Sequence, residues 1–234
     1  MPPVPPSPAV PPLHVRHHAS MLAALERRAL VWLARRTPAF VTSDHLTWIG
    51  TAGMLGVGCA LAAASTSRAW LALVPVFLAV NWLGDSLDGT LARVRNTQRP
   101  RYGYYLDHVM DLANTVVLFA GLGVSGIASP FVAGGLLVCY LLLAAESFLA
   151  AHALGVFRIS FGAFGPTELR LLLAVGALVA IERPVVTPFG LGPMLLWDAG
   201  GLCGIVGMAI AVVFTAVRNA RRLSVADPLP GKTS

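Results

Sequence analysis

The chain has 234 residues, of which 56% are hydrophobic and 12% are charged, and its formal net charge is +6. With a mean hydropathy of +0.72, it is too apolar and too poor in charge for an ordinary water-soluble domain, in which about a quarter of the residues are charged. The composition therefore predicts an all-α integral membrane protein.

The first 37 residues fall into two parts. Residues 1–17 are rich in proline and are predicted to be a disordered tail. Residues 18–37 carry an amphipathic pattern, which predicts a juxtamembrane, interfacial helix. Its apolar positions are Leu22, Leu25, Trp32 and Leu33, with Arg27, Arg28 and Arg35 largely opposite. A cytosolic cap packed on protein fits the same pattern equally well, so both alternatives stay open.

Six apolar segments follow, and each is near the roughly 20 residues that a helix needs to cross a bilayer. We predict transmembrane helices at about 44–64, 69–92, 104–125, 130–153, 166–182 and 197–217. Residues 38–223 then form one six-helix transmembrane domain, and residues 224–234 form a cytoplasmic tail. The third segment begins with polar residues, which makes sense only if these residues face the interior of the bundle.

The basic residues determine the orientation that we expect. Of the 17 Lys and Arg residues, all but Arg68 and Arg183 fall on the side that holds both termini and the loop between the second and third spans. The positive-inside rule places that side in the cytoplasm, and we expect the protein in the inner cell membrane. Because this distribution accounts for the net positive charge, nucleic-acid binding is not expected.

Four carboxylates lie in the second and third predicted spans. Asp85 and Asp88 are three residues apart and Asp107 and Asp111 are four apart, so each pair projects from one face of a helix. Ionisable groups at membrane depth are costly and indicate a functional site. If the two faces meet, their all-oxygen ligands suit Mg²⁺ or Mn²⁺ and give no support to zinc.

These acids belong to a longer pattern, D-x-x-D-G-x-x-A-R, then nine residues, then G-x-x-x-D-x-x-x-D. The pattern resembles the signature of the CDP-alcohol phosphotransferase (CDP-alcohol phosphatidyltransferase) family. Every fixed position is filled, by Asp85, Asp88, Gly89, Ala92, Arg93, Gly103, Asp107 and Asp111. The resemblance implies a six-helix bundle with a polar cavity at the cytoplasmic membrane boundary.

The resemblance also implies roles for the residues of the signature. The four aspartates would hold two divalent ions, Mg²⁺ or Mn²⁺, and Asp111 would also be the catalytic general base. The CDP diphosphate would be bound by Gly89, Ala92, Arg93 and Gly103.

By the same resemblance, the chain is expected to be an enzyme of phospholipid biosynthesis of the EC 2.7.8 type. It would transfer a phosphatidyl group from CDP-diacylglycerol to a small polar alcohol and release CMP, as do the bacterial phosphatidylglycerophosphate and phosphatidylinositol-phosphate synthases, whose short six-span form it resembles. Alternatively, it would transfer a phospho-alcohol from a soluble CDP-alcohol to a lipid acceptor. The G-P-T-E opening of the fifth span resembles the choline and ethanolamine transferases, which act in that way.

Two other classes of protein are alternatives. The stretch from Asn81 to Asp88 and the D-x-x-x-D from Asp107 to Asp111 resemble the diphosphate-binding aspartates of a UbiA-like prenyltransferase. The continuation through Gly89 favours the CDP-alcohol family. A divalent-cation transporter is the alternative that is not an enzyme.

The acceptor could be held by arginines at the cytoplasmic end of the bundle. The candidates for binding an anionic acceptor or headgroup are Arg101, Arg158 and Arg170, although each could equally be an anchor of the positive-inside kind. Asn81 and Asn114 suit hydrogen bonds between helices. Glu146 either pairs, stays protonated or lines the cavity.

Small residues in the first span form a close-packing surface, made by Gly50, Gly53, Gly56 and Gly58. Such a surface suits either a neighbouring helix or a dimer interface, and we expect a homodimer. The three cysteines lie in separate spans without metal-ligand spacing, so no disulfide is predicted.

Overall fold

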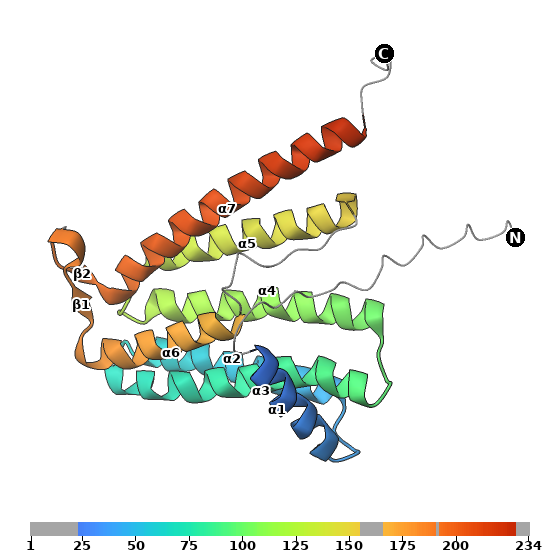
Figure 1. The fold of residues 1–234 in the computed structure, drawn as a ribbon. Helices are drawn as coiled ribbons and strands as arrows, with labels where there is room; N and C mark the ends of the chain where they lie inside the picture. Colours follow the sequence, from blue (N-terminus) through green and yellow to red (C-terminus); the bar gives the residue numbers. More distant parts are fainter. Residues whose placement is uncertain (1–22, 155–165, 191, 228–234) are drawn as a thin grey trace, which may run out of the picture.

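The computed structural model describes residues 23–154, 166–190 and 192–227 (Figure 1). Of these, 84% are helical, which confirms the all-α prediction. The elements are α1 (Ala23–Arg36), α2 (Ser43–Ala63), η1 (Arg68–Leu73), α3 (Val74–Val94), α4 (Pro100–Val124), α5 (Pro130–Leu154), α6 (Pro166–Glu182), β1 (Val185–Val186), η2 (Pro188–Gly190), β2 (Met194–Leu195) and α7 (Leu196–Ala226). The two strands pair antiparallel in a short hairpin between α6 and α7.

The helices begin at residues that suit a helix N-terminus. Thr42 caps α2, since its side chain accepts from the backbone N–H of His45 and the His45 side chain accepts from the Thr42 N–H. Proline opens α4, α5 and α6, where the missing N–H would have no partner in the helix.

The end of α3 positions the loop that follows the first half of the signature. Asn96 has φ 54°, a left-handed conformation that asparagine tolerates better than most residues. The N–H of Asn96 donates to the carbonyl of Arg93, and that of Thr97 donates to the carbonyl of Ala92. These two bonds make a Schellman ending. The helix therefore stops just after Arg93, and Pro100 opens α4 after a short loop.

Helices α2, α3 and α4 pack closely because glycines lie where they meet. A Cβ on Gly53 would lie 2.6 Å from the backbone nitrogen of Asn81 on α3, and one on Gly84 would lie 2.5 Å from the carbonyl oxygen of Leu46 on α2. A Cβ on Gly121 of α4 would lie 2.5 Å from the Gly58 carbonyl oxygen. The glycine surface predicted on the first span therefore faces neighbouring helices of the same chain.

The bounds of the helices agree with those of the predicted segments, except that the last helix is longer. Helices α2, η1–α3, α4, α5 and α6 begin and end within four residues of the predicted bounds, whereas α7 continues through Ala226, nine residues beyond the prediction. In the described part of the chain, four segments are long and apolar enough to cross a membrane: Ser43–Ala63, Arg68–Val94, Pro130–Leu154 and Leu196–Ala226. Helices α4 and α6 are not among these four. Polar residues occupy the first turns of α4, and α6 has only 17 residues.

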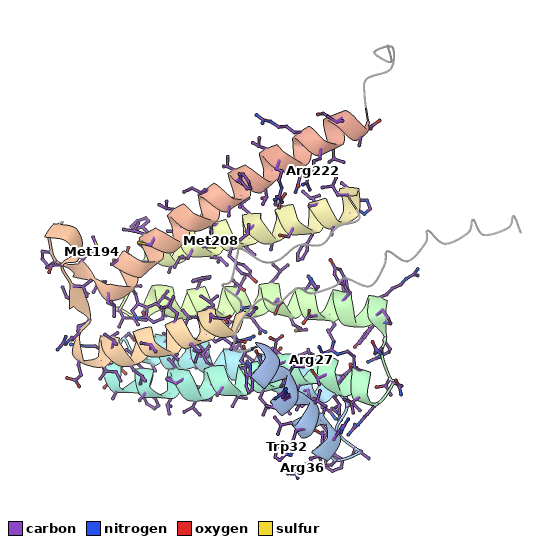
Figure 2. All side chains as sticks on the ribbon, in the orientation of Figure 1. Arg27, Trp32, Arg36, Met194, Met208 and Arg222 are labelled. Atoms are coloured by element: carbon purple, nitrogen blue, oxygen red, sulfur yellow. The ribbon has the colours of Figure 1, made fainter. Side chains whose placement is uncertain are left out.

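Helix α1 crosses the bundle obliquely and covers part of α3 (Figure 1). Its buried side carries Leu30 and Ala34, which pack with Leu46, Leu87 and Leu91. Trp32, which belongs to the predicted apolar arc, does not lie on this side. It is 52% exposed and lies under the Arg36 guanidinium, 4.0 Å from the ring centroid (Figure 2). Residues 1–22, which include the predicted tail, lie outside the described residues.

Candidate functional site

Three of the four signature aspartates converge. Asp85 of α3 and Asp107 and Asp111 of α4 each offer a carboxylate oxygen, and these oxygens lie within 4.8 Å of one another. We call these three residues the acid cluster. Helices α3 and α4 both pack on α2. A spacing of four residues puts Asp107 and Asp111 on one face of α4, and their side chains meet that of Asp85 from α3. Carboxylate oxygens at this spacing are the donor set that Mg²⁺ and Mn²⁺ take, so the residues fit a divalent ion.

Asp88, the fourth aspartate, is not in the acid cluster. Its Oδ2 accepts a hydrogen bond of 2.7 Å from the Thr47 hydroxyl of α2, and its Oδ1 contacts the backbone N–H of Gly89. Its carbonyl accepts from the Ser43 hydroxyl at 3.0 Å. The close packing of α2 on α3 brings these hydroxyls to Asp88, whose role as a metal ligand stays a prediction.

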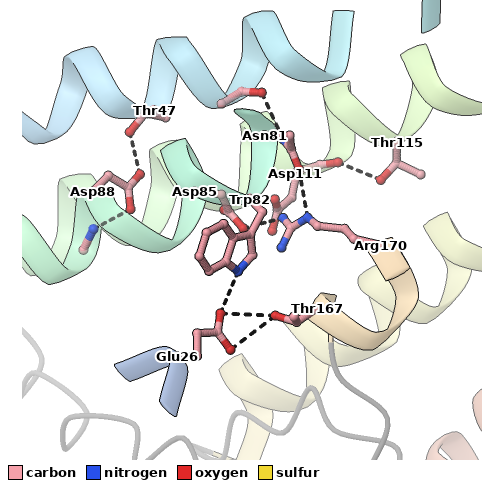
Figure 3. A network of polar contacts seen from close by, with 12 residues as sticks. Glu26, Thr47, Asn81, Trp82, Asp85, Asp88, Asp111, Thr115, Thr167 and Arg170 are labelled. Atoms are coloured by element: carbon pink, nitrogen blue, oxygen red, sulfur yellow. Dashed lines mark hydrogen bonds and ion pairs between the residues drawn. The ribbon is translucent and has the colours of Figure 1, made fainter. Parts of the chain in front are cut away.

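Arg170 of α6 reaches the acid cluster (Figure 3). Its Nη2 lies 2.5 Å from Oδ2 of Asp85, and its Nε donates to Oδ1 of Asn81 at 2.9 Å. Asn81 in turn donates to the carbonyl of Gly50 at 2.9 Å. The buried Asn81 therefore makes the bonds between helices that the sequence predicts, and it also orients the guanidinium.

Asp111 is the most exposed member of the acid cluster, since Asp85 and Asp107 are half-buried. The Thr115 hydroxyl donates to its backbone carbonyl, not to its carboxylate, at 2.8 Å (Figure 3). His108 is buried, with its Nδ1 2.7 Å from the Tyr104 carbonyl oxygen and its ring centroid 5.2 Å from that of Phe148 on α5. Of these groups, the Asp111 carboxylate is the best placed to meet a group that enters from outside.

The other signature residues lie around the acid cluster with space beside them. A Cβ on Gly103 would meet no other described atom within 4 Å, and one on Gly89 would meet only the tip of Arg93, at 3.5 Å. Packing within the described chain therefore does not require glycine at either position. The exposed Arg93 donates to the Thr90 hydroxyl at 3.1 Å. Ala92 is half-buried on the same helix.

The remaining polar residues singled out in the sequence have different outcomes. Glu146 accepts a hydrogen bond at its Oε1 from the side-chain amide of Asn219 on α7, at 2.7 Å. Arg101 is exposed in the first turn of α4. Arg158 lies outside the described residues.

Three side chains at the site were not predicted from the sequence. They are Ser43 and Thr47, which hold Asp88, and Glu26 of α1, which accepts hydrogen bonds from Trp82 and Thr167. Glu26 is the only acid in α1. A single acid in a basic helix is visible in the sequence, but the helical periodicity does not identify the residues that Glu26 contacts.

Comparison with known proteins identifies the family. A sequence model described as CDP-alcohol phosphatidyltransferase matches residues 40–217. The phosphatidylinositol phosphate synthase of Cutibacterium acnes is 32% identical over 83 residues. That alignment spans 36% of this chain and 38% of the relative's length, so it covers well under half of each protein.

A solved structure shows the same fold. It is the phosphatidylinositol phosphate synthase of Mycobacterium tuberculosis with CDP-DAG bound, which is 23% identical with a TM-score of 0.55. The match covers 84% of this chain and 94% of that chain. The region that the family model matches, residues 40–217, contains the whole signature together with all the helices from α2 to α6. The chain belongs to the CDP-alcohol phosphatidyltransferase family.

Proposed function

We propose that the protein transfers a phosphatidyl group from CDP-diacylglycerol to a small polar alcohol and releases CMP. The observation that carries this proposal is the convergence of Asp85, Asp107 and Asp111 within 4.8 Å, in a chain of this family. The two relatives support a CDP-linked lipid as donor, since both are phosphatidylinositol phosphate synthases and one holds CDP-DAG.

The acid cluster, joined by Asp88, would hold two divalent ions. When bound, these ions would supply positive charge to the diphosphate and to the leaving CMP. Arg93 would bind the diphosphate from the side left open by Gly89, next to Ala92, and Gly103 would leave room at the start of α4.

Asp111 would act as the general base. Its carboxylate takes the proton from the acceptor hydroxyl, and the resulting oxygen attacks the phosphorus distal to cytidine. A new P–O bond forms to the acceptor, the bond between the two phosphates breaks, and CMP leaves with the electron pair. The greater exposure of Asp111 suits a residue that must meet an incoming alcohol.

The acceptor would be a phosphorylated alcohol. Arg170 lies at the acid cluster, and a guanidinium suits a phosphate because it donates in a planar fork. Arg101 and Arg158 remain candidates for the same role. Inositol phosphate is the first acceptor to test, because both relatives are named for its product.

The site would face the cytoplasm in a protein of the inner cell membrane. In this arrangement α4 and α6 also cross the bilayer, which makes six spans, and both termini are cytoplasmic. Helix α1 would lie on the membrane surface, since a basic face with an exposed Trp32 beside Arg36 suits the headgroup region (Figure 2). A homodimer stays part of this proposal.

The test is acceptor-dependent release of CMP by the purified protein in detergent with CDP-diacylglycerol and Mg²⁺. Inositol phosphate, glycerol phosphate, inositol and serine are compared, and EDTA should abolish turnover until Mg²⁺ or Mn²⁺ is restored. Full turnover in chelator would contradict the metal site. CMP release from CDP-choline with diacylglycerol, and none from CDP-diacylglycerol, would establish the soluble-donor alternative instead.

A further inference from the structure

Glu26 joins three helices through one carboxylate (Figure 3). Its Oε1 accepts from the indole N–H of Trp82 on α3 at 2.8 Å. The Thr167 hydroxyl of α6 donates to the same carboxylate, 3.2 Å from Oε1 and 3.4 Å from Oε2. The carboxylate is half-buried, so these bonds are less exposed to competition from water than those of a surface glutamate.

The partners of Glu26 are close neighbours in the sequence of the two residues that form the Arg170–Asp85 pair. Trp82 precedes Asp85 by three residues on α3, and Thr167 precedes Arg170 by three residues on α6. Residues three apart on a helix share a face, so Trp82 lies beside Asp85 on α3 and Thr167 lies beside Arg170 on α6. The two helices run antiparallel, since Arg68, just before α3, donates to the carbonyl of Ile181 near the end of α6. The helices are thus linked twice, directly by Arg170 with Asp85, and through Glu26 by Thr167 with Trp82.

The first turn of α6 lies away from the buried part of that helix. It begins at Pro166, and in the described chain the buried residues of α6 are Ala177 and Ala180, far from this end. The bond to Glu26 therefore ties the end of α6 that carries Arg170 to α1 and α3. We propose that Glu26 is a positioning residue that holds the first turn of α6 against α3 and so sets where the Arg170 guanidinium lies. This inference rests on the proposed function, because Arg170 is there an acceptor-binding residue.

The kinetic test varies donor and acceptor separately. Glu26→Ala and Thr167→Val should each raise the KM for inositol phosphate by about tenfold, equivalent to about 1.4 kcal/mol, while the KM for CDP-diacylglycerol stays close to that of the unmodified protein. Thr167→Ser keeps the hydroxyl and should restore the acceptor KM. Glu182→Gln, which changes an exposed carboxylate at the other end of α6, is the matched control.

Coupling to Arg170 separates positioning from a general loss of structure. In an Arg170→Gln background, Glu26→Ala should add little to the acceptor KM, because it acts through the missing guanidinium. Equal changes in both KM values, or effects that add fully in the double variant, would overturn the proposal.

A measurement of the helix position tests the same idea without turnover. Spin labels at the exposed residues Leu172 of α6 and Val76 of α3 report the distance between the two helices. Glu26→Ala should broaden the distance distribution and Thr167→Ser should not. An unchanged distribution overturns the proposal even if the enzyme is active. Lack of turnover by the unmodified protein with every acceptor would instead contradict the proposed function.

Discussion

Arg170 and Asp85, which are 85 residues apart in the chain, form an ion pair at 2.5 Å, and their side chains are only 16% and 29% exposed. A guanidinium thus lies against one of the three carboxylates that could ligate a divalent ion. The pair neutralises charge in the acid cluster, and it also engages an oxygen that a metal would need.

Arg170→Gln should therefore bind Mn²⁺ more tightly than the unmodified protein, by up to about tenfold, because a nearby positive charge is removed and Asp85 is released. Its affinity for a phosphorylated acceptor should fall. Electron paramagnetic resonance of free Mn²⁺, without substrate, measures the first effect. The matched control is Arg99→Gln, which breaks the more exposed pair with Asp44. Weaker or unchanged Mn²⁺ binding in Arg170→Gln would contradict competition for Asp85.

Asp111→Asn should separate chemistry from binding. Asparagine keeps the size and one oxygen but cannot accept the proton, so turnover should fall by at least about 10²-fold. Asp88→Asn should weaken the affinities for metal and CDP-substrate together, because it removes a ligand charge. Metal titrations and nucleotide affinities of both variants provide the comparison. If Asp111→Asn loses nucleotide binding as completely as Asp88→Asn, Asp111 is not the base.

Gly84→Ala should destabilise the contact between α2 and α3. The new Cβ would lie 2.5 Å from the Leu46 carbonyl oxygen, so the backbones must separate, at a cost of about 1–3 kcal/mol. Gly134→Ala is the control, since its Cβ would meet no other described atom within 4 Å and alanine favours a helix. Thermal unfolding in detergent should show a lower midpoint for Gly84→Ala and no lower midpoint for Gly134→Ala. Equal midpoints would show that the helices separate without cost.

The orientation can be tested by labelling in intact cells. With the native cysteines replaced, a membrane-impermeant thiol reagent should label Thr187→Cys, in the segment between α6 and α7, and not Gln98→Cys, between α3 and α4. Both positions are exposed, whereas Ile127 in the turn between α4 and α5 is buried and unsuitable. Labelling at position 98 and not at 187 would reverse the topology.

The sequence alone predicted the helices and the signature, because both depend on local properties. Hydropathy over about 20 residues locates the segments that become α2 to α7, and prolines and caps fix most of their starts. The spacing of Asp107 and Asp111 puts both carboxylates on one face of α4, whatever α4 packs against. The family could be recognised from the signature for the same reason, since all its positions lie within one helix pair.

Only the tertiary structure decided which partners these residues have. Periodicity gives the face of a helix but not the helix that it meets, so it could not show that Thr47 holds Asp88 away from the acid cluster. Nor could it place Trp32 outside the buried face of α1. The contacts of Glu26 and Arg170 join α1, α3 and α6, which are far apart in the chain. They depend on how those helices cross. Side-chain packing between distant segments determines this crossing, and no local pattern encodes it.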